Sequence, residues 1–156
     1  MNQTFYDFNL ITIYGQPLPL TNFKGKKVLI VNTASACGYT PQYAQLQELH
    51  NLYASKLIII GCPCNDFGNQ EPASEAEIAE FCSLNFDVKF ILTSKVQVLP
   101  PNEHPLFNWL QTTSNKPITW NFQKFLINEN GQIHAVIKPS ASPFDDVLLN
   151  WLKDDV

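Results

Sequence analysis

The sequence predicts an α/β fold in which a central mixed sheet is flanked by helices. First, two β-branched apolar runs at residues 28–31 and 57–61 enclose a segment with helical periodicity. Second, apolar runs at residues 122–127 and 133–137 are joined by an Asn-Gly turn, which indicates a β-hairpin. Third, 45% of the residues are hydrophobic and 15% are charged, a composition typical of one globular core. We therefore expect a single domain over residues 1–156.

The first apolar runs form a strand-helix-strand unit. Residues 28–31 (VLIV) and 57–61 (LIIIG) predict two buried strands. Between them, Thr40 suits a helix N-cap and Pro41 the first helical position, and apolar residues then recur every three or four positions up to Tyr53. Such a unit implies two parallel strands joined by a right-handed crossover.

Three further helices follow from capping and periodicity. Ser74 and Glu77 have the spacing of a capping box, and the helix that they open places Cys82 on its apolar face. Residues 104–111 predict a third helix and residues 143–153 the last one. A strand-helix-strand unit followed by a helix, a hairpin and a closing helix is the element order of a thioredoxin-like fold.

Charge and cysteine content narrow the possible functions. The chain has 10 Lys+Arg against 14 Asp+Glu, and the basic residues are scattered, which argues against nucleic acid or an anionic membrane as the main partner. No secretory leader is recognisable, and no run approaches the ~20 apolar residues of a membrane span, so we expect a cytoplasmic protein. Four cysteines in such a chain favour catalysis or metal binding over structural disulfides.

Cys37 lies in a run of small and turn-forming residues, NTASACGYTP, between the first strand and the first helix. Unpaired N–H groups and the helix dipole favour an anion at this place, and hence the reactive thiolate. Residues 37–40 (CGYT) have the form of a C-x-x-C motif with threonine in the second position. The alternative is a small buried hydrophobic side chain, and position alone does not decide between the two.

Three blocks, NTASACGYTPQY, GCPCNDFGNQEP and TWNFQKFLINENG, resemble the signature blocks of the glutathione peroxidase family in order and distance. The similarity runs from about Phe5 to the final helix. It implies a thioredoxin fold and peroxide reduction by cysteine or selenocysteine, and we expect no cofactor and no metal. By position in the blocks, the peroxidatic residue falls on Cys37, the glutamine on Gln70, and the Trp-Asn pair on Trp120 and Asn121.

These residue types suit peroxide chemistry. Two side-chain amides and an indole offer N–H donors that stabilise a thiolate and a polarised peroxide oxygen without titrating. The thiolate would attack one peroxide oxygen, release water or an alcohol, and leave a sulfenic acid for a second thiol to resolve. Without the blocks, Gln70 would be read as a surface residue, Trp120 as a core residue and Asn121 as a turn residue.

The resemblance places the resolving cysteine in the helix after the second block, at Cys82. The alternative is that Cys82 only packs on the apolar helix face. If Cys82 starts buried and remote from Cys37, a disulfide requires backbone movement. Cys64 matches a mostly structural cysteine of the family, and Cys62 replaces the usual phenylalanine as an additional thiol.

The extra assembly loop of tetrameric, glutathione-specific members is not recognisable before Trp120, so the resemblance favours a monomer reduced by thioredoxin. Such short members have an open site suited to organic, including lipid, hydroperoxides. Two alternatives stay open: a peroxide sensor that relays oxidation to a partner protein, and a glutathione-dependent peroxidase in which Cys82 is structural. The spacing of Cys62, Cys64 and Cys82 disfavours a metal module. A cysteine at position 37 is also compatible with replacement of selenocysteine.

Overall fold

The computed structural model describes residues 2–153, and a five-stranded sheet with the order β5-β4-β3-β6-β7 forms its centre. β3 pairs in parallel with β4 and antiparallel with β6, so the sheet is mixed, as predicted. The strands are β3 (Lys27–Thr33), β4 (Leu57–Pro63), β5 (Ile91–Leu92), β6 (Lys124–Ile127) and β7 (Ile133–Ile137).

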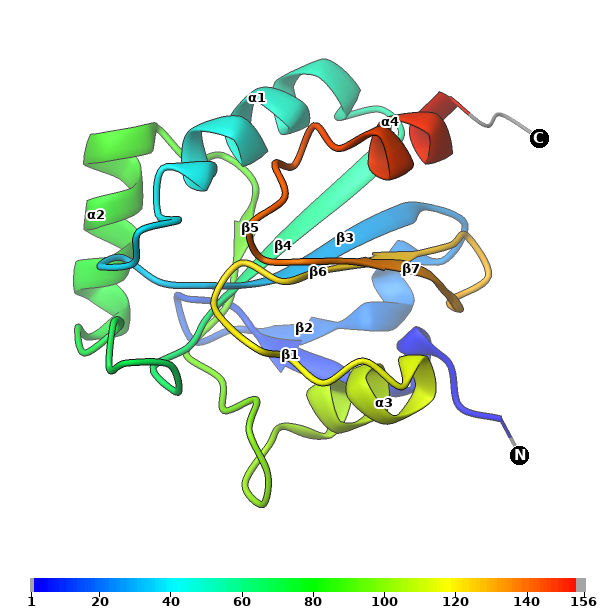
Figure 1. Ribbon diagram of the computed structural model, residues 1–156, viewed down its shortest axis with the longest axis horizontal. Coiled ribbons are helices and arrows are strands. Elements are labelled where there is room, and N and C mark those ends of the chain that lie inside the picture. The colour runs from blue at the N-terminus through cyan, green and yellow to red at the C-terminus, as the bar shows by residue number, and fades with distance from the viewer. Residues whose placement is uncertain (1, 154–156) are drawn as a thin grey trace.

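Helices cover both faces of this sheet (Figure 1). Helices α1 (Gln42–Tyr53), α2 (Glu75–Phe86) and α4 (Asp146–Lys153) belong to one face, and α3 (Pro105–Ser114) packs on the other. All seven residues of β3 are buried, because this strand lies in the middle of the sheet with both faces covered. The turn after β3 therefore leaves from the most rigid part of the molecule.

The N-terminal elements were not expected from the sequence. They are η1 (Phe5–Asp7), β1 (Asn9–Ile11), β2 (Pro17–Pro19) and η2 (Leu20–Phe23). The two strands form a small antiparallel sheet on the side of α3. Each strand has three residues and one of them begins and ends with proline, so neither shows a readable alternation of apolar and polar residues.

Two predicted helix starts were wrong. Thr40 does not cap α1, which begins at Gln42 after Pro41 and has no side-chain cap. The Thr40 hydroxyl is already engaged in the preceding turn, where it accepts a hydrogen bond from the Cys37 N–H (2.9 Å). The last helix begins at Asp146 rather than at residue 143, because residues 142–145 form a turn in which the Asp145 N–H donates to the Ser142 carbonyl oxygen (3.0 Å). Asp145 Oδ1 then accepts from the Val147 N–H (2.9 Å) in the first turn of the helix, as an N-cap side chain does.

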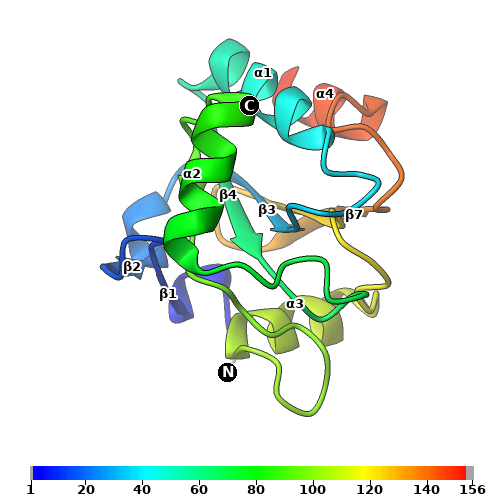
Figure 2. The ribbon, with the colours of Figure 1, turned by 90° about the vertical axis from the view of Figure 1, so that its left-hand side faces the viewer.

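Helix α2 has the predicted capping box but few anchors to the body of the protein. Ser74 Oγ accepts from the Glu77 N–H (3.2 Å), and Glu77 Oε1 accepts from the Ser74 N–H (3.1 Å). Only Ile78 and Cys82 of this helix are buried. Helix α2 forms the left-hand edge of the molecule in Figure 1 and faces the viewer in Figure 2, and an element with few fully buried side chains has a low free energy of local unfolding.

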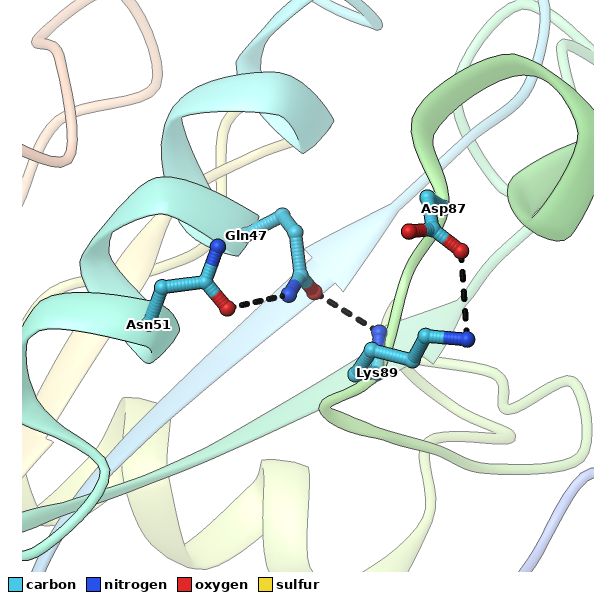
Figure 3. A network of polar contacts seen from close by, with 4 residues as sticks. All are labelled: Gln47, Asn51, Asp87 and Lys89. Carbon is cyan, nitrogen blue, oxygen red and sulfur yellow. Dashed lines mark hydrogen bonds and ion pairs between the residues drawn. The ribbon is translucent and has the colours of Figure 1, made fainter.

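The segment after α2 is fastened more firmly. The Lys89 N–H donates to Gln47 Oε1 of α1 (2.7 Å), and Gln47 Nε2 donates to Asn51 Oδ1 (2.9 Å) (Figure 3). Lys89 Nζ also pairs with Asp87 (3.1 Å) at the end of the helix. The chain thus has a fixed point just beyond the loosely held helix.

No helix within residues 2–153 is long and apolar enough to cross a membrane.

Candidate active site

Cys37 lies in the turn between β3 and α1 and is 7% exposed. Its N–H donates to Thr40 Oγ1 (2.9 Å), and its carbonyl oxygen accepts from the Thr40 N–H (3.0 Å). The Tyr39 N–H donates to Cys37 Sγ at 3.3 Å, so a backbone donor already points at the sulfur. The turn itself, rather than a capped helix, therefore supplies the donor to the sulfur.

Cys37 borders a pocket of about 500 Å³. The pocket is lined by Cys37, Gly38, Tyr39, Thr119, Trp120, Lys138, Pro139 and Ser140. Lys138 is the one charged residue among them, and two of the others are aromatic. The sulfur therefore faces a space that accepts small molecules with an apolar portion.

Trp120 and Asn121 reach the site from the loop before β6. Trp120 lines the Cys37 pocket, while Asn121 is fully buried and its Nδ2 donates to Gln70 Oε1 (3.1 Å). The Gln70 carbonyl oxygen accepts from the Ala36 N–H (3.1 Å), beside Cys37 in the chain. Within residues 2–153, no hydrogen bond joins Gln70, Trp120 or Asn121 to the Cys37 sulfur.

The loop that carries Gln70 depends on a close approach to Trp120. Gly68 has a φ of +64°, and a Cβ atom there would lie 3.4 Å from both the Trp120 ring and the Gln70 side chain. The ring of Phe67 packs against Trp120 with centroids 5.6 Å apart. Glycine suits position 68 because other residues rarely adopt this φ, whereas a Cβ atom at 3.4 Å would be in ordinary contact.

Asn32, at the carboxyl end of β3, holds the Trp-Asn turn from two sides. Its carbonyl oxygen accepts from the Phe122 N–H (2.6 Å), and its Nδ2 donates to the Trp120 carbonyl oxygen (3.1 Å). Sequence reasoning missed this role. The available signal was a polar residue directly after a buried apolar strand, which must find partners if it is buried as well.

The hydrogen bond between Ser35 and Glu71 was also not predicted from the sequence. Ser35 Oγ donates to Glu71 Oε1 (2.8 Å), and the Glu71 N–H donates to Asn65 Oδ1 (2.8 Å). Burial raises the pKa of Glu71, while the bonds from Ser35 and the charge of Lys95 lower it. The pair ties the Cys37 turn to the second block, and the acidic residue next to Gln70 was its only sign in the sequence.

Cys82 does not line the Cys37 pocket. It lies in the middle of α2, is 1% exposed, and faces a separate cavity bordered by Ile13, Tyr14 and Leu92. Burial raises the pKa of its thiol to about 11. Both thiols are free, and the two predicted redox cysteines line different cavities.

Cys62 and Cys64 lie on the other face of the sheet. Both are fully buried in the core that includes α3, and burial raises the pKa of each thiol to about 12. Cys82 belongs to the opposite core, so the three thiols of the metal hypothesis do not converge.

Comparisons with known proteins identify the family to which this chain is similar. Residues 5–111 match the sequence model of the family described as glutathione peroxidase. "Glutathione peroxidase-like peroxiredoxin GPX5" of Chlamydomonas reinhardtii is 43% identical over 147 residues, with 91% of each chain covered. "Hydroperoxy fatty acid reductase gpx1" of Synechocystis is 43% identical over 143 residues, with 85% of each chain covered. The crystal structure of Trgpx in its apo form has a TM-score of 0.78 and 29% identity, and covers 99% of this chain and 98% of that one.

Proposed function

The chain belongs to the glutathione peroxidase family and is a glutathione peroxidase-like thiol peroxidase, and from this premise we propose that Cys37 is its peroxidatic residue. The observation that carries the proposal is the pocket in which Cys37, with an N–H donor on its sulfur, meets Trp120. We further propose Gln70, Trp120 and Asn121 as the donors of the reaction, and Cys82 as the resolving thiol.

In the first step, the Cys37 thiolate attacks one peroxide oxygen, so an S–O bond forms and the O–O bond breaks. The leaving oxygen takes a proton and departs as water or an alcohol, and the sulfur becomes a sulfenic acid. Gln70 accepts from Asn121 through its oxygen, which leaves its amide N–H groups free to donate. Donors aimed at the developing negative charge are the main source of acceleration in such a step.

In the second step, the Cys82 thiolate attacks the oxidised sulfur, and the S–S bond replaces the S–O bond as water leaves. This step requires α2 to unwind, because Cys82 starts in a different cavity from Cys37. The two buried side chains of α2 give a weak attachment, and the bond between Lys89 and Gln47 keeps the following chain in place. Unwinding would also remove Cys82 from the burial that raises its pKa.

A hydroperoxide is the oxidant of this enzyme and a thiol its reductant, as its homologues indicate. We propose that the reductant is thioredoxin, since similar proteins of Chlamydomonas reinhardtii and Saccharomyces cerevisiae are named peroxiredoxins. The aromatic lining from Tyr39 and Trp120 supports organic hydroperoxides as substrates beside hydrogen peroxide. We also propose that residues 1–156 act as one domain and as a cytoplasmic monomer.

The test is steady-state peroxide consumption with thioredoxin, its reductase and NADPH, compared with glutathione and its reductase. We expect turnover with thioredoxin, and its loss in Cys82→Ser while Cys37 is still oxidised by peroxide. Preference for glutathione, or full activity of Cys82→Ser, would contradict a resolving role for Cys82. Oxidation of Cys37 without turnover on either reductant would instead favour a peroxide relay.

A further inference from the structure

Lys124, the first residue of β6, is a buried lysine that the reaction described above does not use. Its side chain is 0% exposed, and its Nζ donates to the carbonyl oxygens of Lys138 (3.5 Å), Pro139 (3.1 Å) and Ala141 (2.5 Å). Two of these contacts are within ordinary hydrogen-bond distance, and the contact to Lys138 is at its outer limit. Burying an amine costs free energy unless its N–H groups find partners, and these carbonyl oxygens supply them.

Within the part of the chain that the structure describes, no ion pair holds the Lys124 amine in place. Burial lowers the pKa of Lys124 to about 7, and the charge of Asp145 opposes that shift only in part. The backbone of residues 138–141 is therefore the main partner of the group. Lys138, Pro139 and Ser140 in that segment line the pocket of Cys37.

The Pro139 carbonyl oxygen has a second donor, from the helix that follows the Cys37 turn. Gln42 Nε2 donates to it at 2.8 Å, and Gln42 is the first residue of α1, directly after the Cys37 turn. Lys124 follows the Trp120-Asn121 loop in the same way. The segment after Cys37 and the segment after Trp120-Asn121 thus both donate to the Pro139 carbonyl oxygen, which belongs to the third segment beside the pocket.

We propose that Lys124, assisted by Gln42, is a positioning residue that fixes residues 138–140 against Cys37 and so sets the fit of the organic part of a hydroperoxide. This assignment rests on the proposed role of Cys37. In this proposal residues 138–140 contact the organic part of the hydroperoxide, whereas the Cys37 turn and the amide donors contact its O–O bond. Loss of the Lys124 contacts should therefore slow the reaction of Cys37 with bulky hydroperoxides more than its reaction with hydrogen peroxide.

The test is the second-order rate of Cys37 oxidation, measured by stopped flow with cumene hydroperoxide and with hydrogen peroxide. For Lys124→Met we expect about a tenfold loss with cumene hydroperoxide and less than about a threefold loss with hydrogen peroxide, since small displacements of a substrate-positioning group have effects of this size or larger. Lys124→Arg keeps charge and donors and should recover most of the rate. Hydrogen exchange at the Ala141 amide should accelerate in Lys124→Met only.

Lys27 offers a matched control. It is also buried, and its Nζ donates to the Trp151 carbonyl oxygen (2.6 Å), but it begins β3 at the end opposite to the Cys37 turn. Lys27→Met should lower thermal stability while leaving the ratio of the two peroxide rates unchanged. Equal ratios in Lys124→Met, Lys27→Met and wild type would overturn the proposal.

If Lys124→Met does not fold, Gln42→Leu provides the second test, because it removes the other donor to the Pro139 carbonyl oxygen and leaves Lys124 in place. A smaller but equally selective loss with cumene hydroperoxide would support the positioning role of Lys124. A wild-type ratio of the two peroxide rates would overturn it. A wild type whose Cys37 reacts with neither peroxide would overturn the proposed function itself. Failure of the positioning role alone is therefore distinguishable from failure of the proposed function, since in the first case Cys37 of the wild type still reacts with peroxide.

Discussion

The two faces of the central sheet each contain two cysteines, and all four are at most 7% exposed. Cys62 and Cys64 lie on the face of α3, whereas Cys37 and Cys82 lie on the face of α1, α2 and α4. Burial alone therefore does not separate the predicted redox pair from the other two thiols.

The backbone separates them. Cys62 belongs to β4, which is hydrogen-bonded to a strand on each side, and the Cys64 N–H donates to the Thr33 carbonyl oxygen (2.9 Å). Cys37 instead lies in a turn with a donor on its sulfur, and Cys82 lies in a helix with only one other buried side chain, Ile78. We therefore expect a buried thiol to be available for chemistry where its backbone can move or already presents the sulfur.

The largest expected effect tests the Cys37 side of this comparison. Cys37→Ser should lower thioredoxin-dependent peroxide turnover by at least about a thousandfold, because a serine hydroxyl without a neighbouring base is a far weaker nucleophile than a thiolate. NADPH consumption measures this directly. Cys64→Ser is the matched control, and comparable losses in the two variants would contradict the assignment of the nucleophile.

A smaller loss is expected when an amide donor is removed from the same face. Asn121→Ala should lower the second-order rate of Cys37 oxidation by about a hundredfold, the size of effect found when one donor to a developing charge is removed. Stopped-flow oxidation by hydrogen peroxide is the measurement. Asn128→Ala, which removes the acceptor of the Trp151 Nε1–H bond (2.9 Å) in the hairpin, should affect stability only. A loss below threefold in Asn121→Ala would exclude it as a donor.

Alkylation compares the two faces directly. With reduced protein and iodoacetamide at pH 7, we expect Cys82 to be modified about ten times faster than Cys62, because α2 opens locally and β4 does not. The pH profile sharpens the test. Reaction through an opened helix should level off near the free thiol pKa of about 8.5 rather than near the value of about 11 that burial imposes on Cys82. Mass spectrometry follows the alkylation. Equal rates for Cys82 and Cys62 would contradict the proposed difference in backbone mobility between α2 and β4.

The smallest effect is expected on the α3 face. Cys62→Ala removes a buried sulfur and should lower the free energy of unfolding by about 1–2 kcal/mol, while peroxide turnover stays within about twofold. Urea unfolding and the coupled assay measure the two quantities. A large loss of turnover with unchanged stability would show that Cys62 takes part in the redox cycle.

The sheet and its main helices could be predicted because each has a strong local signal. The runs at residues 28–31 and 57–61 are confirmed as parts of β3 and β4, and the capping box at Ser74 opens α2 as expected. The start of α1 was mispredicted, since the Thr40 side chain bonds to Cys37, a competition that a local capping rule does not contain. The strands β1 and β5 are too short to show a period.

The site was predictable only in part. The resemblance of three sequence blocks placed Cys37, Gln70, Trp120 and Asn121, and the structure brings Trp120 to the Cys37 pocket and pairs Asn121 with Gln70. The supporting groups were not visible in the sequence. Lys124 and Asn32 act through contacts with segments distant in the chain, and the sequence does not show which segments these are, even where a polar residue after an apolar run marks Asn32 as a candidate.

Phe122 shows how a protein design calculation could misjudge this site. Its φ of +69° suits glycine, and the other non-glycine residues with positive φ among those described are Asn69, Asp87 and Asn115. The strain amounts to roughly 1–3 kcal/mol. However, the buried ring packs against Tyr43 with centroids 5.4 Å apart, and deleting a buried phenylalanine typically costs about 3–5 kcal/mol. A redesign that scored each residue by its own backbone would choose glycine at position 122 and obtain the less stable protein.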